Sequence, residues 1–82
     1  MEKKLIEEQI KDIISNRLEI DLKLIKLESK LKDELGIDSF GLVEMSFEIK
    51  DKFGIALQDQ DFQSIVTVKD AVAFISARLK EK

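Results

Sequence analysis

Residues 35–54 read LGIDSFGLVEMSFEIKDKFG and contain the signals that fix where one helix begins and where it ends. Asp38 belongs to the residue types that cap helix N-termini, and it directly precedes a run with apolar residues at helical spacing. Gly54 stands where a left-handed C-terminal cap is expected. The stretch therefore predicts a helix over residues 39–53. Apolar residues cover more than half of its circumference, so we expect this helix to contact neighbours on two sides.

Two more long helices and one short helix are predicted along the chain. Apolar residues recur at helical spacing over residues 3–18 and again over residues 67–80. The latter segment begins with Thr67 as an N-cap and Asp70 three positions later, which is a capping box with aspartate in place of the usual glutamate. Residues 59–65 have the length and apolar spacing of a short helical segment.

A long connection joins the first two helices. Residues 18–37 contain leucine and isoleucine side chains that can hold the segment onto the helices, and residues 18–27 alternate in part between polar and apolar types. A short strand is therefore an alternative there. The predicted fold class is all-α: a four-helix bundle of three long helices and one short helix, with a long loop between helices 1 and 2. Residues 1–82 are expected to form a single domain.

The predicted core consists of the apolar residues on the helices and in the short segment between them. They are Phe40, Leu42, Val43, Met45, Phe47, Ile49, Phe62, Ile65, Val68, Ala71, Val72 and Ile75. We expect Phe40 to be more exposed than the others, because it lies in the first turn of its helix.

The composition excludes several classes of function. The chain has no Cys and no His, so thiolate catalysis, zinc–thiolate sites and the commonest general base are absent. The formal net charge is −3 and the only aromatic residues are five Phe, which argues against a nucleic-acid-binding surface. We therefore expect no catalytic residues, no metal site and no nucleic-acid partner.

No targeting or membrane segment is evident. No apolar run approaches the roughly 20 residues of a membrane span, and charges are distributed through the first twelve residues, unlike a secretory signal peptide. We expect a cytoplasmic protein with no membrane insertion. No segment for an additional interface is apparent, so a monomer is also expected.

Ser39 is the residue for which the sequence suggests a chemical role. It lies at the end of the long connection and in the first turn of the predicted helix, where its hydroxyl is expected to be exposed. It is a poor nucleophile because a catalytic serine needs a nearby base, and this chain has no His. It would be a good acceptor for a phosphate ester, because the free N–H groups and the positive dipole end of a helix favour an anion at that place.

The sequence around Ser39 resembles the attachment region of the acyl carrier protein family. In LGIDSFGLVEMSFEIKDKFGI, the matching positions are Leu35, Gly36, Asp38, Ser39, Val43, Glu44 and Phe53. The stretch DQDFQSIVTVKDAVAFI is similar to the family's third and fourth helices, and the whole chain has the family's length and element order. The full set of matches is far more specific than the short Asp-Ser motif.

The resemblance implies a cofactor and a set of partners. By it, Ser39 would carry a covalent 4′-phosphopantetheine from coenzyme A, added by a separate phosphopantetheinyl transferase, and the arm would supply the thiol that the chain lacks. Asp38 would support this attachment beside the transferase's metal ion, although its capping role is enough to explain it. The implied function is an acyl carrier that holds acyl intermediates as thioesters and presents them to loading and processing enzymes in fatty-acid or related biosynthesis.

A docking surface is predicted on the helix over residues 39–53. Glu44, Glu48 and Asp51 share one face with Gly41, and they form either a solvated face or an acidic stripe for basic patches on partner enzymes. In resembling proteins this helix has the docking role. Phe40 is expected to belong to the same partner interface.

Some positions depart from the family pattern and leave the partner set open. Phe40 replaces the usual Leu, and Gly41 replaces a residue that is often acidic. Gly41 also weakens the helix by up to about 1 kcal/mol relative to Ala. Lys50 and Lys52 dilute the acidity, and Gln58 stands where many relatives have Pro. These departures suggest a specialised carrier.

Other functions stay open on the sequence alone. The cargo could be polyketide or aminoacyl intermediates, since the loading enzymes choose it. A helical interaction module that is never modified is a second alternative. An enzyme using Ser39 or a carboxylate cluster is a third, and the absent His and Cys argue against it.

Overall fold

The computed structural model describes residues 2–80 and contains four α-helices and one 3₁₀ turn in that range. The elements are α1 (Lys3–Leu18), η1 (Leu22–Leu24), α2 (Ser39–Phe53), α3 (Asp59–Ser64) and α4 (Val68–Lys80). The predicted fold class, three long helices and one short helix with a long loop after the first, is confirmed. The predicted bounds of α1 and α2 are also confirmed, and those of α3 and α4 differ by one residue.

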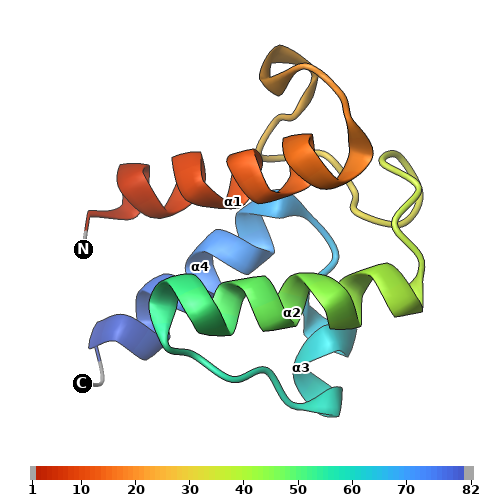
Figure 1. The fold of residues 1–82 in the computed structure, drawn as a ribbon. Helices are drawn as coiled ribbons and strands as arrows, with labels where there is room; N and C mark the ends of the chain where they lie inside the picture. The colour runs from red at the N-terminus through yellow and green to blue at the C-terminus, as the bar shows by residue number, and fades with distance from the viewer. Residues whose placement is uncertain (1, 81–82) are drawn as a thin grey trace.

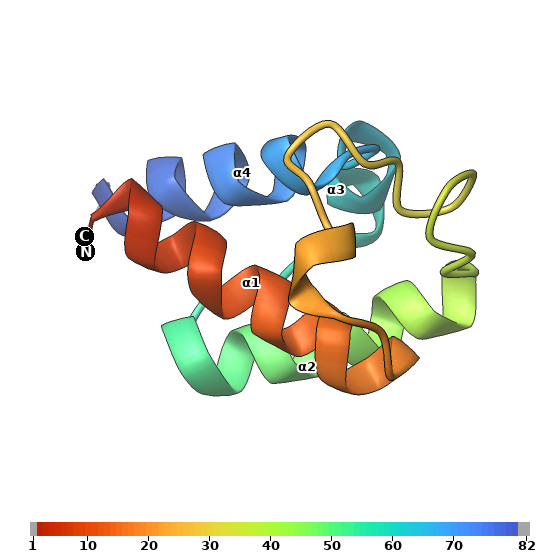
Figure 2. The same ribbon diagram turned by 90° about the horizontal axis from the view of Figure 1, so that it is seen from above.

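The helices surround one core, with α1 packed on both α4 and α2 (Figure 1). The chain runs in opposite directions along α1 and α2, so the long loop carries it from the end of α1 to the start of α2. Seen from above, the loop crosses beside the start of α4 before it reaches α2 (Figure 2). The short α3 lies beyond the N-terminal half of α2, at the same end of the molecule as this loop.

The core is built mainly from branched aliphatic side chains. Its most completely buried members are Ile6, Ile10, Ile14, Ile25, Leu31, Val68, Val72 and Ile75. Most of the predicted core residues are buried, but three residues of α2 are not: Phe40, Val43 and Phe47 are 71%, 40% and 63% exposed. The prediction of Val43 and Phe47 as core residues was therefore wrong. Helix α2 is buried through Leu42, Met45, Ile49 and Phe53, and its second apolar stripe faces solvent.

The long loop forms no extended strand in the described part of the chain, despite its partial alternation. Residues 22–24 form a 3₁₀ turn, and Lys30 makes an isolated antiparallel bridge with Thr67. Backbone hydrogen bonds from Leu31 N–H to Val66 O (2.9 Å) and from Lys69 N–H to Leu27 O (2.8 Å) fasten the loop to the start of α4. Of the apolar side chains in this stretch, Ile25 is buried and Ile20 and Leu27 are partly buried against the core, whereas Leu22 and Leu24 are exposed. The backbone groups of residues 27–31 bond to residues 66–69 rather than to a second strand.

Caps fix both ends of α2 as predicted. The Asp38 carboxylate accepts a hydrogen bond from Gly41 N–H at 2.7 Å, and Gly54 adopts the left-handed conformation at the C-terminal end. Gly36 also has a positive φ of 73°, a region that favours glycine, and it turns the loop towards α2. These local features place the first turn of α2, and hence Ser39, at a defined position.

The predicted capping box at α4 is also present. The Thr67 hydroxyl accepts from Asp70 N–H (3.1 Å), and the Asp70 carboxylate accepts from the N–H groups of Thr67 (3.0 Å) and Val66 (3.1 Å). The hydrogen bond from Thr67 N–H is the main cause that lowers the pKa of Asp70 below 3.8, and burial opposes it. The ionised form of Asp70 therefore stabilises the fold.

We expect a pH-dependent effect of Asp70→Asn on stability. Because the folded-state pKa is lower than the unfolded value, the stabilisation from the ionised carboxylate is present above about pH 4 and is lost as the pH falls through the folded pKa. The difference in the free energy of unfolding between wild type and Asp70→Asn should be largest near pH 7 and should shrink towards pH 3. Urea unfolding across this range measures it, and a difference that is constant with pH would contradict the prediction.

Candidate functional site

Ser39 is the first residue of α2, and its side chain is exposed. Its hydroxyl has no hydrogen-bond partner among residues 2–80. By contrast, Ser15, Ser29 and Ser46 each use their hydroxyl in a bond to the backbone. Ser39 is thus accessible to another molecule and is not needed for a local contact.

The first turn of α2 offers a favourable place for an anion. The backbone N–H groups of Ser39 and Phe40 have no acceptor within residues 2–80, as is usual at the start of a helix. Asp38 already uses its carboxylate on Gly41 N–H. The positive end of the helix dipole also points towards this turn. A phosphate ester on the Ser39 oxygen would meet free N–H donors there.

Close packing explains the glycine at position 41, and the sequence alone did not reveal this. A Cβ atom at this position would come within 3.0 Å of Ile37 Cγ2 and 3.3 Å of Asp38 Oδ1. A side chain there would therefore press on the buried Ile37 and on the capping carboxylate. The glycine weakens α2 in terms of helix propensity, but it allows the close approach of the loop that positions Ser39.

A cleft of about 300 Å³ opens beside Ser39, between the loop, α2 and α3. Its lining residues are Lys32, Ser39, Leu42, Val43, Asp59, Phe62 and Gln63. The apolar members form a surface on which a flexible chain attached to Ser39 could rest. A larger hollow of about 650 Å³ lies between α1 and the start of α4, but it does not include Ser39. The candidate site is therefore identified by the exposed Ser39 hydroxyl and not by the volume of the cleft.

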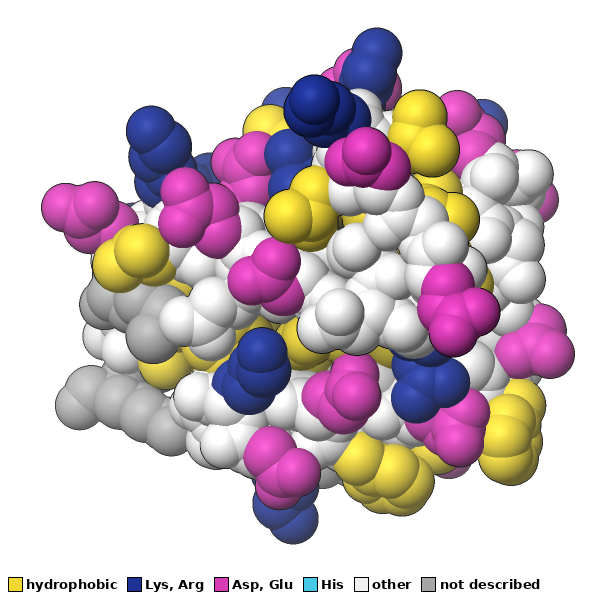
Figure 3. Space-filling view, turned by 45° about the horizontal axis from the view of Figure 1, so that its top comes forward, with side chains coloured by type: hydrophobic (Ala, Val, Ile, Leu, Met, Phe, Trp, Pro, Cys, Tyr) yellow, Lys and Arg dark blue, Asp and Glu magenta, His cyan; other side chains and the backbone are white. Residues whose placement is uncertain are grey.

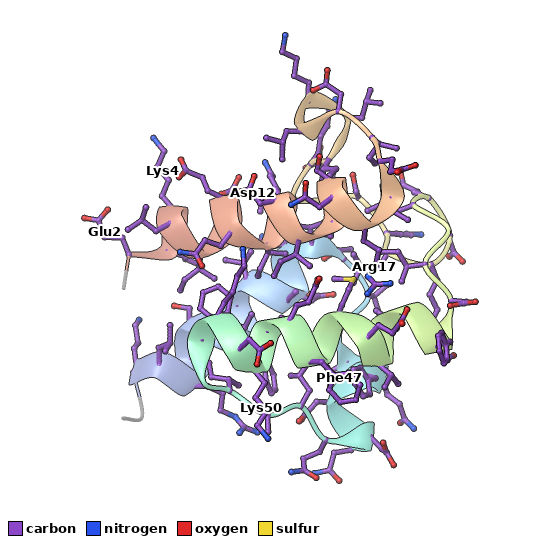
Figure 4. All side chains as sticks on the ribbon, in the orientation of Figure 1. Glu2, Lys4, Asp12, Arg17, Phe47 and Lys50 are labelled. Atoms are coloured by element: carbon purple, nitrogen blue, oxygen red, sulfur yellow. The ribbon has the colours of Figure 1, made fainter. Side chains whose placement is uncertain are left out.

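Glu44 is engaged by α1 and is not a free acidic group. Arg17 Nη1 lies 2.7 Å from Glu44 Oε1, so that the pair joins the end of α1 to the middle of α2. Figure 4 shows Arg17 between these two helices. Arg17 Nε is buried and has no acceptor within residues 2–80, so Glu44 is the main partner of this guanidinium. No local pattern predicts this pairing, because the two residues are 27 positions apart in the sequence.

An apolar stripe runs along the exposed side of α2 from the candidate site. Phe40, Val43 and Phe47 are spaced three and four positions apart, so they share one side of the helix. In Figure 4 the Phe47 side chain projects from α2 on the side away from α1. We call these three residues the α2 stripe. The sequence shows their spacing and predicts the exposure of Phe40, but it does not predict that Val43 and Phe47 lie outside the core.

The remaining predicted acidic positions lie among basic residues. Glu48 and Asp51 are exposed, and so are Lys50 and Lys52. The space-filling view shows acidic and basic side chains interspersed on the face that it displays, with no continuous patch of one sign (Figure 3). The acidity of α2 is therefore diluted on its surface, as the sequence suggested.

Comparison with known proteins shows the family. Residues 8–75 match the sequence family described as the phosphopantetheine attachment site. A solved structure of an acyl carrier protein from Enterococcus faecalis is similar, with a TM-score of 0.79 and 31% sequence identity over 94% of this chain and 98% of that chain. The chain belongs to the acyl carrier protein family, the class of non-catalytic carriers that bear a phosphopantetheine attachment domain.

The residues of the site fit the family's prosthetic group. The Ser39 hydroxyl is exposed and has no partner among residues 2–80, so the group can be attached without breaking a contact. The free N–H groups of the first turn can bind its phosphate, and the adjoining cleft has room for its chain. When bound, the group supplies a thiol, which the chain itself lacks. Within residues 2–80, no cluster of three or more acidic residues could hold a metal ion, and no helix is long and apolar enough to cross a membrane.

Proposed function

We propose that this protein carries acyl intermediates as thioesters on a 4′-phosphopantetheine arm attached to Ser39. The observation that supports this most directly is the exposed, unpartnered Ser39 hydroxyl at the N-terminus of α2, within the segment that matches the attachment family. Fatty-acid or related biosynthesis is the proposed setting. The proposal includes a monomeric, cytoplasmic carrier that acts as one unit over residues 1–82.

In this proposal the arm comes from coenzyme A through a phosphopantetheinyl transferase. The Ser39 oxygen forms a bond to the phosphorus next to the pantetheine, the bond to the second phosphorus of coenzyme A breaks, and adenosine 3′,5′-bisphosphate leaves. The serine proton passes to the transferase, because the Ser39 hydroxyl is hydrogen-bonded to no basic group among residues 2–80. The chain contributes accessibility and an electrostatic environment for the new phosphodiester.

The proposal is tested by loading the protein and then removing the cargo. The protein is incubated with an acyl-coenzyme A and a broad-specificity transferase, and its intact mass is measured before and after mild hydroxylamine. We expect a gain of one acyl-phosphopantetheine, followed by loss of the acyl group alone, because hydroxylamine cleaves thioesters and leaves the phosphodiester. If a folded protein gains no mass while a control carrier does, the carrier function is contradicted and an unmodified interaction module is favoured.

We further propose that Phe40 anchors partner enzymes together with the rest of the α2 stripe, while the acidic residues have a smaller role. Exposed aromatic side chains beside the attachment residue fit an apolar recess in a partner, and buried aromatic anchors often dominate binding energy. Glu44 is held by Arg17, and Glu48 and Asp51 lie among lysines. These acidic residues would mainly affect the rate of encounter.

We expect the double variant Phe40→Ala/Phe47→Ala to lower kcat/KM for conversion by the transferase about thirty- to seven-hundredfold, with little change in stability. The reason is that hot-spot side chains contribute at least about 1–2 kcal/mol each. The effect should be similar at low and high salt. The matched control is Leu24→Ala, because Leu24 is 64% exposed but lies in η1, off the stripe.

The result for the acidic residues separates the two modes of docking. Glu48→Gln/Asp51→Asn should change kcat/KM by only a fewfold, and only at low salt. Glu44 is unsuitable for this comparison, since its removal also leaves Arg17 without its main partner. A large effect of the acidic pair together with no effect of the two phenylalanines would overturn the apolar docking mode.

A further inference from the structure

We propose that Lys32 is a positioning residue for the prosthetic group, and that its ammonium pairs with the phosphodiester on Ser39. The inference rests on the proposed attachment at Ser39 and assigns a role to a residue that the attachment motif does not include. The inference predicts where on the protein surface the phosphodiester end of the arm lies.

Lys32 and Ser39 line the same cleft of about 300 Å³. Lys32 is the one cationic side chain among the residues that line it; the others are apolar or neutral apart from Asp59. A phosphodiester attached to the Ser39 oxygen carries one negative charge and is covalently tethered at this cleft. Because the anion cannot diffuse away, a flexible cation that lines the same small space meets it at high effective concentration.

The backbone on both sides of Lys32 is held in place. Leu31 is buried at 1% exposure and donates its N–H to Val66 O at 2.9 Å, and Lys32 O accepts from Gly36 N–H at 3.2 Å. The Lys32 side chain itself is exposed and makes no ion pair among residues 2–80. Because its backbone is held and its ammonium makes no ion pair among residues 2–80, Lys32 is available to the phosphate.

A second, smaller hollow of about 170 Å³ defines a control. It shares Lys32, Phe62 and Gln63 with the cleft, and it is also lined by Lys30. Lys30 is exposed and lies in the same loop, but it does not line the space that contains Ser39. Lys30 therefore shares the local sequence environment and the charge of Lys32 without its access to the arm.

Asp59 contributes a negative charge to the cleft. This exposed carboxylate lines the cleft together with Lys32 and would repel a phosphodiester. The free N–H groups at the start of α2 and the Lys32 ammonium attract it. These charges therefore favour positions of the phosphodiester close to the Lys32 ammonium and the start of α2 over positions close to Asp59.

The first test follows the lysine side chains when the arm is attached. Lysine labelled with ¹³C at Cε gives separate NMR signals for Lys32 and Lys30 in the protein before and after conversion by the transferase. We expect the Lys32 signal to move on attachment and to return towards its original position at high salt, whereas the Lys30 signal changes little. Equal shifts for the two lysines, or none for Lys32, would overturn the proposal.

The second test uses the ³¹P signal of the converted protein. Lys32→Ala should move this signal towards its position in the unfolded converted protein and remove its salt dependence, while Lys32→Arg should retain both and Lys30→Ala should match wild type. Because the pair is exposed, its removal in Lys32→Ala should lower the population of the phosphodiester held at this place about two- to fivefold. A Lys32→Ala spectrum identical to wild type would contradict the pairing. If wild type gains no arm at all, the proposed attachment itself fails, and that result is distinct from a failure at Lys32.

Discussion

Ser39→Ala is expected to abolish the gain of phosphopantetheine completely. The alanine has no oxygen that could bond to phosphorus, and no other residue of the first turn of α2 has a hydroxyl. Intact-protein mass after incubation with coenzyme A and a broad-specificity transferase measures the result. Wild type should gain one group, and the variant should keep its original mass.

The fold of the variant should be unaffected, which makes the result interpretable. The Ser39 side chain is exposed and makes no hydrogen bond in residues 2–80, so its removal should change the free energy of unfolding by less than about 0.5 kcal/mol. Ser64→Ala is the matched control, because Ser64 is an exposed serine at the end of α3. Ser64→Ala should convert like wild type. Modification that persists in Ser39→Ala would place the attachment elsewhere and contradict the proposed site.

Ile10→Ala is expected to cause a large loss of stability. Ile10 is fully buried where α1 packs against the rest of the core. Its truncation removes apolar contacts and leaves a cavity, which costs about 2–5 kcal/mol in comparable cores. A domain of this size has a total stability of roughly 4–12 kcal/mol, so the loss is a large fraction of it. Thermal unfolding should show a decrease in Tm of at least about 10 °C.

An exposed position in the same helix provides the comparison. Leu5 is 46% exposed, so Leu5→Ala should change the free energy of unfolding by well under half as much as Ile10→Ala. Both substitutions are aliphatic-to-alanine changes in α1, and their effects on helix propensity differ by only about a few tenths of a kcal/mol. Equal losses at the two positions would show that the packing described for α1 is wrong.

The fold was largely predictable because its signals are local. Asp38 and Gly54 mark the ends of α2, and Thr67 with Asp70 marks the start of α4, through hydrogen bonds that span three or four residues. Such contacts depend on spacing along the chain, which the sequence displays directly. The same holds for the location of Ser39 in the first turn of a helix.

The surface of α2 was less predictable because its exposure depends on what packs nearby. Phe47 and Ile49 are both apolar residues of the same helix, but Ile49 is 3% exposed and Phe47 is 63% exposed. Nothing local distinguishes them, since a helix with apolar residues around most of its circumference can bury any face. Within residues 2–80 the α2 stripe stays exposed, so the tertiary packing and not the local pattern decided which apolar residues of α2 are buried.

The sequence by itself determined the order of the helices, their caps, the position of Ser39 and the lack of a thiol that an attached arm would supply. Only the tertiary structure decided that Glu44 pairs with Arg17, that the α2 stripe is exposed, and that Lys32 shares a cleft with Ser39. The physical reason is the range of the interactions. Caps and helical periodicity act within one or two turns, whereas ion pairs, burial and clefts arise between segments that the fold brings together.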